Sequence, residues 1–183
     1  MIKTGKIISV PISHEMRVEA WRKSDEMGKL KNSILGGAGN ETGFLGEEVV
    51  KKWGGDKVKL EGDNTYNYDI IINGQKCDVK SKLTTVKPKA EYDCSVAAYN
   101  TSQKCDLYIF VRIHDLLEIG WILGYFPKEE YYKKATFLKK GDVDPTNNFT
   151  VKADCYNLKI YDLIDIKELI NEKEETVQEN AST

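Results

Sequence analysis

The sequence predicts an α+β (α/β) protein in which a central mixed β-sheet is flanked by helices. The chain of 183 residues is long enough for one domain with a sizeable core. Hydrophobic residues make up 40% and charged residues 31%, which is ordinary for a folded globular protein. Helix-like segments occupy the first third of the chain, and β-prone runs dominate from about residue 69 onward.

The N-terminal third contains a short strand and two helices. Residues 6–12 read as an extended arm or strand, and Ser13 is the type of residue that caps a helix. That first helix runs to about residue 30 and is followed by a glycine-rich loop over residues 36–40. A second helix spans about 43–53 and is stopped by two glycines.

The rest of the chain alternates strands with two further helices. We expect strands over 69–72, 75–82, 95–99, 107–113, 119–126 and 158–164, and helices over 127–137 and 166–174. We therefore divide the chain into an N-terminal arm and helix (1–42), the main domain (43–174) and a disordered polar tail (175–183).

Composition excludes several classes of protein. No apolar run approaches the ~20 residues that a membrane helix needs, and the N-terminus lacks a secretory signal, so we expect no membrane association. The four cysteines form no Cys-x-x-Cys pair, which argues against structural zinc and favours reduced thiols in the cytoplasm. The net charge is −2, so any basic groove must come from local clusters of lysines. The alternative is that these lysines only form solvent-exposed surface.

The most informative segment is a predicted hairpin. Asn73-Gly74 lies between two β-prone runs, and this dipeptide suits the positive φ angles of a type I′ turn. A two-residue loop there sets Ile70 opposite Cys77 and Asp69 opposite Asp78. Alternation then places both aspartates and Lys80 on the face away from the apolar residues.

Two facing carboxylates repel each other, so we expect something to compensate their charge. Lys80 or a shared proton compensates in part, and a divalent cation such as Mg²⁺ compensates best, because it prefers carboxylate oxygens. The alternative is an exposed hairpin whose charges point into solvent. The spacing by itself does not decide between these two interpretations.

The pattern Asp69 … Asp78-Val79-Lys80, preceded by Gly46-Glu47 on a helix, resembles the PD-(D/E)XK nuclease superfamily, with its restriction-endonuclease-like core. Tyr68 stands at the proline position of that motif, and Asp78 stands where glutamate is commoner. Residues 31–47 also resemble small phage-encoded nucleases of this type, which would place the protein in the host-cell cytoplasm.

The resemblance implies roles for particular residues. It implies that Asp69, Asp78, Glu47 and the Val79 carbonyl hold Mg²⁺, for which Mn²⁺ substitutes. It implies that Lys80 positions the attacking water, so that the catalytic set is Glu47, Asp69, Asp78 and Lys80. DNA-binding candidates are Lys82, which shares the face of Lys80, together with Lys51, Lys52 and Gln103.

The expected function is therefore Mg²⁺-dependent hydrolysis of DNA phosphodiester bonds by an endonuclease. Three alternatives stay open: a non-catalytic DNA-binding or assembly protein on the same fold, an exonuclease, and a junction resolvase. The expected partner is DNA, and pairing as a homodimer is left open.

Overall fold

The computed structural model describes residues 7–27, 40–60 and 67–171. Its centre is a mixed six-stranded sheet in the order β1-β7-β6-β4-β3-β2. The pairing of β4 with β6 is parallel, and all other neighbours in this sheet are antiparallel. The predicted α+β class with a mixed sheet is confirmed. The strands are β1 (Ile8–Pro11), β2 (Val58–Leu60), β3 (Ile70–Ile72), β4 (Gln75–Leu83), β6 (Leu107–His114) and β7 (Ile119–Pro127).

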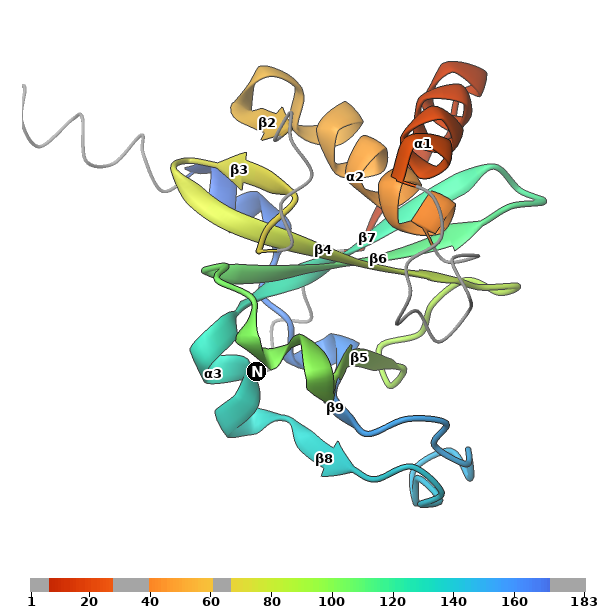
Figure 1. The fold of residues 1–183 in the computed structure, drawn as a ribbon, viewed down its shortest axis with the longest axis vertical. Coiled ribbons are helices and arrows are strands. Elements are labelled where there is room, and N and C mark those ends of the chain that lie inside the picture. The colour runs from red at the N-terminus through yellow and green to blue at the C-terminus, as the bar shows by residue number, and fades with distance from the viewer. Residues whose placement is uncertain (1–6, 28–39, 61–66, 172–183) are drawn as a thin grey trace, which may run out of the picture.

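Helices α1 (His14–Met27) and α2 (Asn40–Gly54) lie on one side of the six-stranded sheet (Figure 1). The Ser13 hydroxyl accepts a hydrogen bond from the Met16 N–H at 3.3 Å, so Ser13 caps α1 as predicted. The expected end of this helix at residue 30 and the loop over 36–39 lie outside the described residues. Helix α2 begins at Asn40, three residues earlier than expected, and buries Leu45, Val49 and Val50 against the sheet.

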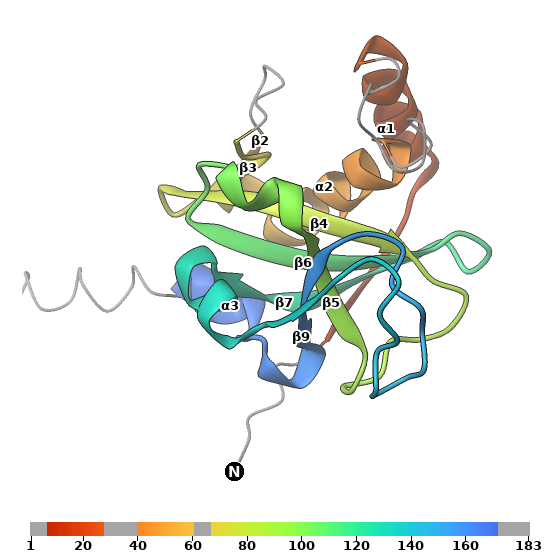
Figure 2. The same ribbon diagram turned by 60° about the horizontal axis from the view of Figure 1, so that its bottom comes forward.

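A second layer covers the opposite face of the six-stranded sheet (Figure 2). It is a three-stranded sheet in the order β5-β9-β8, formed by β5 (Asp93–Ala97), β9 (Cys155–Lys159) and β8 (Thr136–Leu138), together with helix α3 (Lys128–Lys134). Its apolar side chains pack on the second face of the central strands, around buried Tyr108, Phe110 and Tyr131. Sequence patterns did not separate this second sheet from the first.

Three predicted elements are wrong in their bounds because tertiary pairing overrides local pattern. The helix expected over 127–137 ends at Lys134, because residues 136–138 pair with β9 instead. The strand expected over 158–164 is β9 at 155–159, and the chain then turns as a 3-10 helix, η3 (Ile160–Asp162). The strand expected over 95–99 is β5 at 93–97, followed by the 3-10 helix η2 (Ala98–Ser102). Residues 166–171 are helical, as predicted.

The described helices are all too short or too polar to cross a membrane.

Close contact between α2 and β4 depends on Gly46. A methyl group built at this glycine would lie 1.7 Å from Ser81 Oγ and 2.9 Å from Ser81 Cβ. Gly43, one turn earlier in the same helix, has no neighbour within 4 Å of such a methyl group. The short helix-to-strand distance at Gly46 is therefore what brings the next residue, Glu47, toward β4.

We predict opposite effects of alanine at these two glycines. Gly46→Ala forces α2 away from Ser81 and lowers the free energy of unfolding by about 1–3 kcal/mol, the usual cost of overpacking. Gly43→Ala raises it by up to about 1 kcal/mol, because alanine is the better helix former. Urea unfolding of both variants measures these changes, and equal effects at the two positions would contradict the close-packing interpretation.

Candidate active site

The β3–β4 hairpin has the predicted register. Asn73 and Gly74 both have positive φ, at 51° and 78°, and Ile72 pairs with Gln75 and Ile70 with Cys77. The regular ladder ends there: β3 begins at Ile70, while β4 continues to Leu83 alongside β6. Beyond Cys77, the described part of β4 therefore has a sheet neighbour on one side only.

Asp69 lies where this ladder ends. Its backbone N–H donates to the Cys77 carbonyl at 2.9 Å, and its carboxylate Oδ2 accepts from the Val79 N–H at 2.7 Å. The Asp69 carboxylate thus accepts the hydrogen bond from the Val79 N–H that a carbonyl of a neighbouring strand would otherwise accept. Asp69 does not simply face Asp78 across the ladder, because its side chain turns along β4.

Asp78 and Lys80 project from the same face of β4, as alternation predicts, and the side chain of Gln103, which follows η2, contacts both of them. Asp78 is only 3% exposed, and its Oδ2 lies 2.5 Å from Lys80 Nζ. Gln103 Nε2 donates to Asp78 Oδ1, and Gln103 Oε1 accepts from Lys80 Nζ, both at 2.9 Å. These three side chains therefore form a closed triangle of polar contacts. Lys80 Nζ also lies 5.5 Å from the centre of the Tyr108 ring.

The carboxyl group of Asp78 lies near enough to Asp69, and that of Asp69 near enough to Glu47, to raise the pKa of the neighbouring acid. Burial, and next the charge of Asp69, raise the pKa of Glu47 to about 9. Burial, and next the charge of Asp78, raise the pKa of Asp69 to about 7. The structure thus brings together the four residues named from the sequence motif: Glu47, Asp69, Asp78 and Lys80.

The other candidates from the sequence lie in different places. Gln103, the weakest of them, is 7% exposed and contacts both Asp78 and Lys80. Lys51 donates to the Val58 carbonyl at 3.2 Å, which ties it to the α2–β2 connection, and Lys52 is exposed. Lys82 is exposed at the far end of β4. The Val79 side chain is buried in the core, and the role of its carbonyl as a metal ligand stays a prediction.

Sequence reasoning missed two lysines. Lys23 of α1 pairs with Glu48 at 2.9 Å, and its charge opposes the rise in the pKa of Glu47 and of Asp69. Lys128 of α3 donates to the Gln103 carbonyl and so helps to hold Gln103 beside Asp78. Neither lysine is close in sequence to the motif, so no local signal points to them.

Carboxylate oxygens are the ligands that Mg²⁺ prefers, and a cation beside Glu47, Asp69 and Asp78 would relieve the repulsion that raises the pKa values of Glu47 and Asp69. The cage is not preformed, because the described residues include no group of three His, Cys, Asp or Glu side chains already arranged to hold an ion. Asp78 Oδ2 contacts Lys80 Nζ and Asp69 Oδ2 accepts from the Val79 N–H, so a cation held by Asp78 Oδ2 would compete with Lys80 for that oxygen.

Comparisons of the chain with protein-family models and with curated proteins give no match. The likeness to PD-(D/E)XK nucleases therefore depends on the motif.

We predict that the protein becomes less stable as the pH rises without a divalent cation. Glu47 and Asp69 have pKa values raised above those of the unfolded chain, so the folded state binds more protons between about pH 4.5 and 9. The free energy of unfolding then falls by up to about 1.4 kcal/mol per pH unit for each proton involved. Urea unfolding from pH 5 to 9 in EDTA measures this slope.

The matched variants are Glu47→Gln and Asp69→Asn, which remove one acid each without changing its size. Each should flatten part of the pH slope, Asp69→Asn below about pH 7 and Glu47→Gln up to about pH 9. If the double variant Glu47→Gln/Asp69→Asn keeps the wild-type dependence of stability on pH, these two carboxyl groups are not its source.

Proposed function

We propose that this protein is a Mg²⁺-dependent endonuclease that hydrolyses DNA phosphodiester bonds. The observation that carries the proposal is the convergence of Glu47, Asp69 and Asp78 with Lys80 where the β3–β4 ladder ends. The order of the acids, with Glu47 on helix α2, Asp69 directly before β3 and Asp78 on β4, and a lysine two positions after the last acid, matches the motif order of PD-(D/E)XK nucleases. Membership of that superfamily is part of the proposal.

Each residue of the candidate site has a distinct role in this proposal. Asp69, Asp78, the Val79 carbonyl and Glu47 would hold the cation, with Mn²⁺ as a substitute. A bound Mg²⁺ would supply Lewis-acid polarisation of the phosphodiester and would make a coordinated water more acidic. Lys80 would position the attacking water and donate to the charge that develops on the phosphate oxygens. Gln103, which contacts both Asp78 and Lys80, positions the two side chains.

The competing proposal is a non-catalytic DNA-binding or assembly protein with the same fold. A purely structural role would not require three acids in a partly buried place, where their repulsion opposes folding. The endonuclease proposal explains this cost, because the cation that relieves it is also the catalyst. Exonuclease or junction-resolvase activity would use the same residues and differs only in DNA shape.

We further propose a cytoplasmic location and a homodimer for double-strand cleavage. All four cysteines are free thiols, which supports a reducing compartment. Each protomer would then cut one strand of the duplex.

The test is cleavage of supercoiled, linear and single-stranded DNA in Mg²⁺ and in EDTA. Wild-type protein should cut in Mg²⁺ only, and nicking of supercoiled circles identifies an endonuclease, because an exonuclease needs an end. Asp78→Asn and Lys80→Ala should each lower the rate at least ~10²–10³-fold, the usual loss when one preorganised group is removed.

Matched controls come from the exposed turn after α2, where Asp56→Asn and Lys57→Gln remove the same charges away from the site. Both controls should cut at the wild-type rate. Cleavage at the wild-type rate by Asp78→Asn would assign the activity to another site or another protein, and the absence of cleavage on all three DNA forms would favour the non-catalytic alternative.

A further inference from the structure

The edge of β4 beyond its pairing with β3, which has no second strand among the described residues, carries a second lysine past the site. β3 pairs with β4 only as far as Cys77, whereas β6 pairs with it through Leu83. Lys80 and Lys82 project from the same face of this edge by strand alternation. Successive residues on one face of a strand are about 7 Å apart, the same order as the step between neighbouring phosphates of a nucleic-acid strand.

Lys82 lies beside Arg112, its partner in the parallel pairing of β4 with β6. Lys82 is exposed and makes no hydrogen bond or ion pair with the residues that the structure describes. Arg112 is only 7% exposed, and its guanidinium donates to two backbone carbonyls, those of Asp93 at 2.5 Å and Val111 at 3.4 Å. Neither cation therefore has a carboxylate in direct contact within the described part of the chain.

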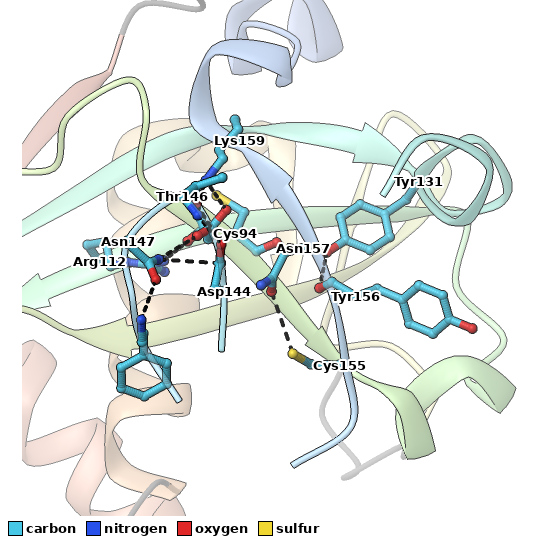
Figure 3. A network of polar contacts seen from close by, with 12 residues as sticks. Cys94, Arg112, Tyr131, Asp144, Thr146, Asn147, Cys155, Tyr156, Asn157 and Lys159 are labelled. Carbon is cyan, nitrogen blue, oxygen red and sulfur yellow. Dashed lines mark hydrogen bonds and ion pairs between the residues drawn. The ribbon is translucent and has the colours of Figure 1, made fainter. Parts of the chain in front are cut away.

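The nearby carboxylates already have partners. Asp93 Oδ1 lies 2.7 Å from Lys159 Nζ, and Asp93 Oδ2 accepts from Asn147 Nδ2 at 3.1 Å. Asp144 Oδ1 accepts from the Thr146 N–H at 2.8 Å and from its hydroxyl at 2.7 Å. Figure 3 shows Arg112 in the same polar network as Asp144, Thr146, Asn147 and Lys159.

Of the charged residues named here, three are cations (Lys82, Arg112 and Lys159) and two are carboxylates (Asp93 and Asp144), and the Asp93 carboxylate is paired with Lys159. Although Lys82 reaches solvent, the strands around it remove part of its hydration, and this loss, and next the charge of Arg112, lower its pKa. Loss of hydration also lowers the pKa of Arg112. A bound anion would relieve this repulsion and would supply Lys82 with the partner that it lacks.

We propose that Lys82 and Arg112 form a phosphate subsite for the DNA phosphodiester next to the one held at Lys80. Lys82 contacts the phosphate directly, and Arg112, fixed by its two carbonyl contacts, supplies positive charge beneath it. This subsite rests on the proposed function and extends it, because it sets the direction in which a DNA strand runs along the edge of β4. Arg112 was not among the residues named from the sequence.

The first test is the salt dependence of DNA binding, measured by fluorescence anisotropy in Ca²⁺ for wild type, Lys82→Gln and Lys57→Gln. Loss of one phosphate contact should reduce the slope of log affinity against log salt by about 0.9 for duplex DNA or about 0.7 for a single strand. Lys82→Gln should show this reduction, Lys82→Arg should restore the slope, and Lys57→Gln should equal wild type.

The second test uses DNA in which one phosphate at a time is replaced by an uncharged methylphosphonate. Wild type should lose affinity when the linkage bound at Lys82 is neutral, and Lys82→Gln should lose nothing further there. Arg112→Lys, which keeps the charge, should retain more affinity than Arg112→Gln, with folding of both checked by circular dichroism.

The outcomes separate this subsite from the proposed activity. An unchanged salt slope in Lys82→Gln, with normal Mg²⁺-dependent cleavage, would overturn the subsite and leave the endonuclease. A reduced slope in a protein that never cuts DNA would support the subsite and overturn the endonuclease. Absence of DNA binding by wild type would overturn both.

Discussion

Repulsion among three carboxyl groups is the constraint on which the candidate site depends. Burial and the charge of Asp69 raise the pKa of Glu47, burial and the charge of Asp78 raise the pKa of Asp69, and neighbouring contacts offset part of this cost. Lys80 and Gln103 contact the two oxygens of Asp78, and the Val79 amide donates to Asp69. These contacts stabilise the protein without metal, and they are also the ones that must rearrange if a cation binds.

The layers on the two faces of the central sheet each position part of the candidate site. Helix α2 approaches β4 closely at Gly46, which brings Glu47 in from one side. The second layer supplies Gln103, which follows η2 and whose carbonyl accepts from Lys128 of α3. The site therefore lies where both layers meet the open edge of β4, and a change in either layer should reach Asp78.

Local sequence predicted the parts of the site that depend on short-range geometry. Asn73-Gly74 determined the hairpin register, and alternation placed Asp78 and Lys80 on one face. It could not predict that Asp69 turns along β4, because that follows from where the ladder ends. The prediction that the helix continues beyond Lys134 is wrong for a similar reason, because residues 136–138 pair with β9, which is a tertiary contact. Gln103, Lys23 and Arg112 gain their neighbours from distant segments, which no local pattern reveals.

We propose that the carboxyl cluster is a cation site at which Glu47 and Asp69 hold protons until the cation arrives. Calorimetric titration of Mg²⁺ into the protein near pH 7, repeated in buffers of different ionisation enthalpy, measures protons released on binding. With the pKa of Glu47 raised to about 9 and that of Asp69 to about 7, Mg²⁺ should bind with release of at least one proton, and Asp78→Asn should weaken binding. Absence of Mg²⁺ binding would contradict this proposal. So would Mg²⁺ binding that releases no proton and has the same affinity in Asp78→Asn as in wild type.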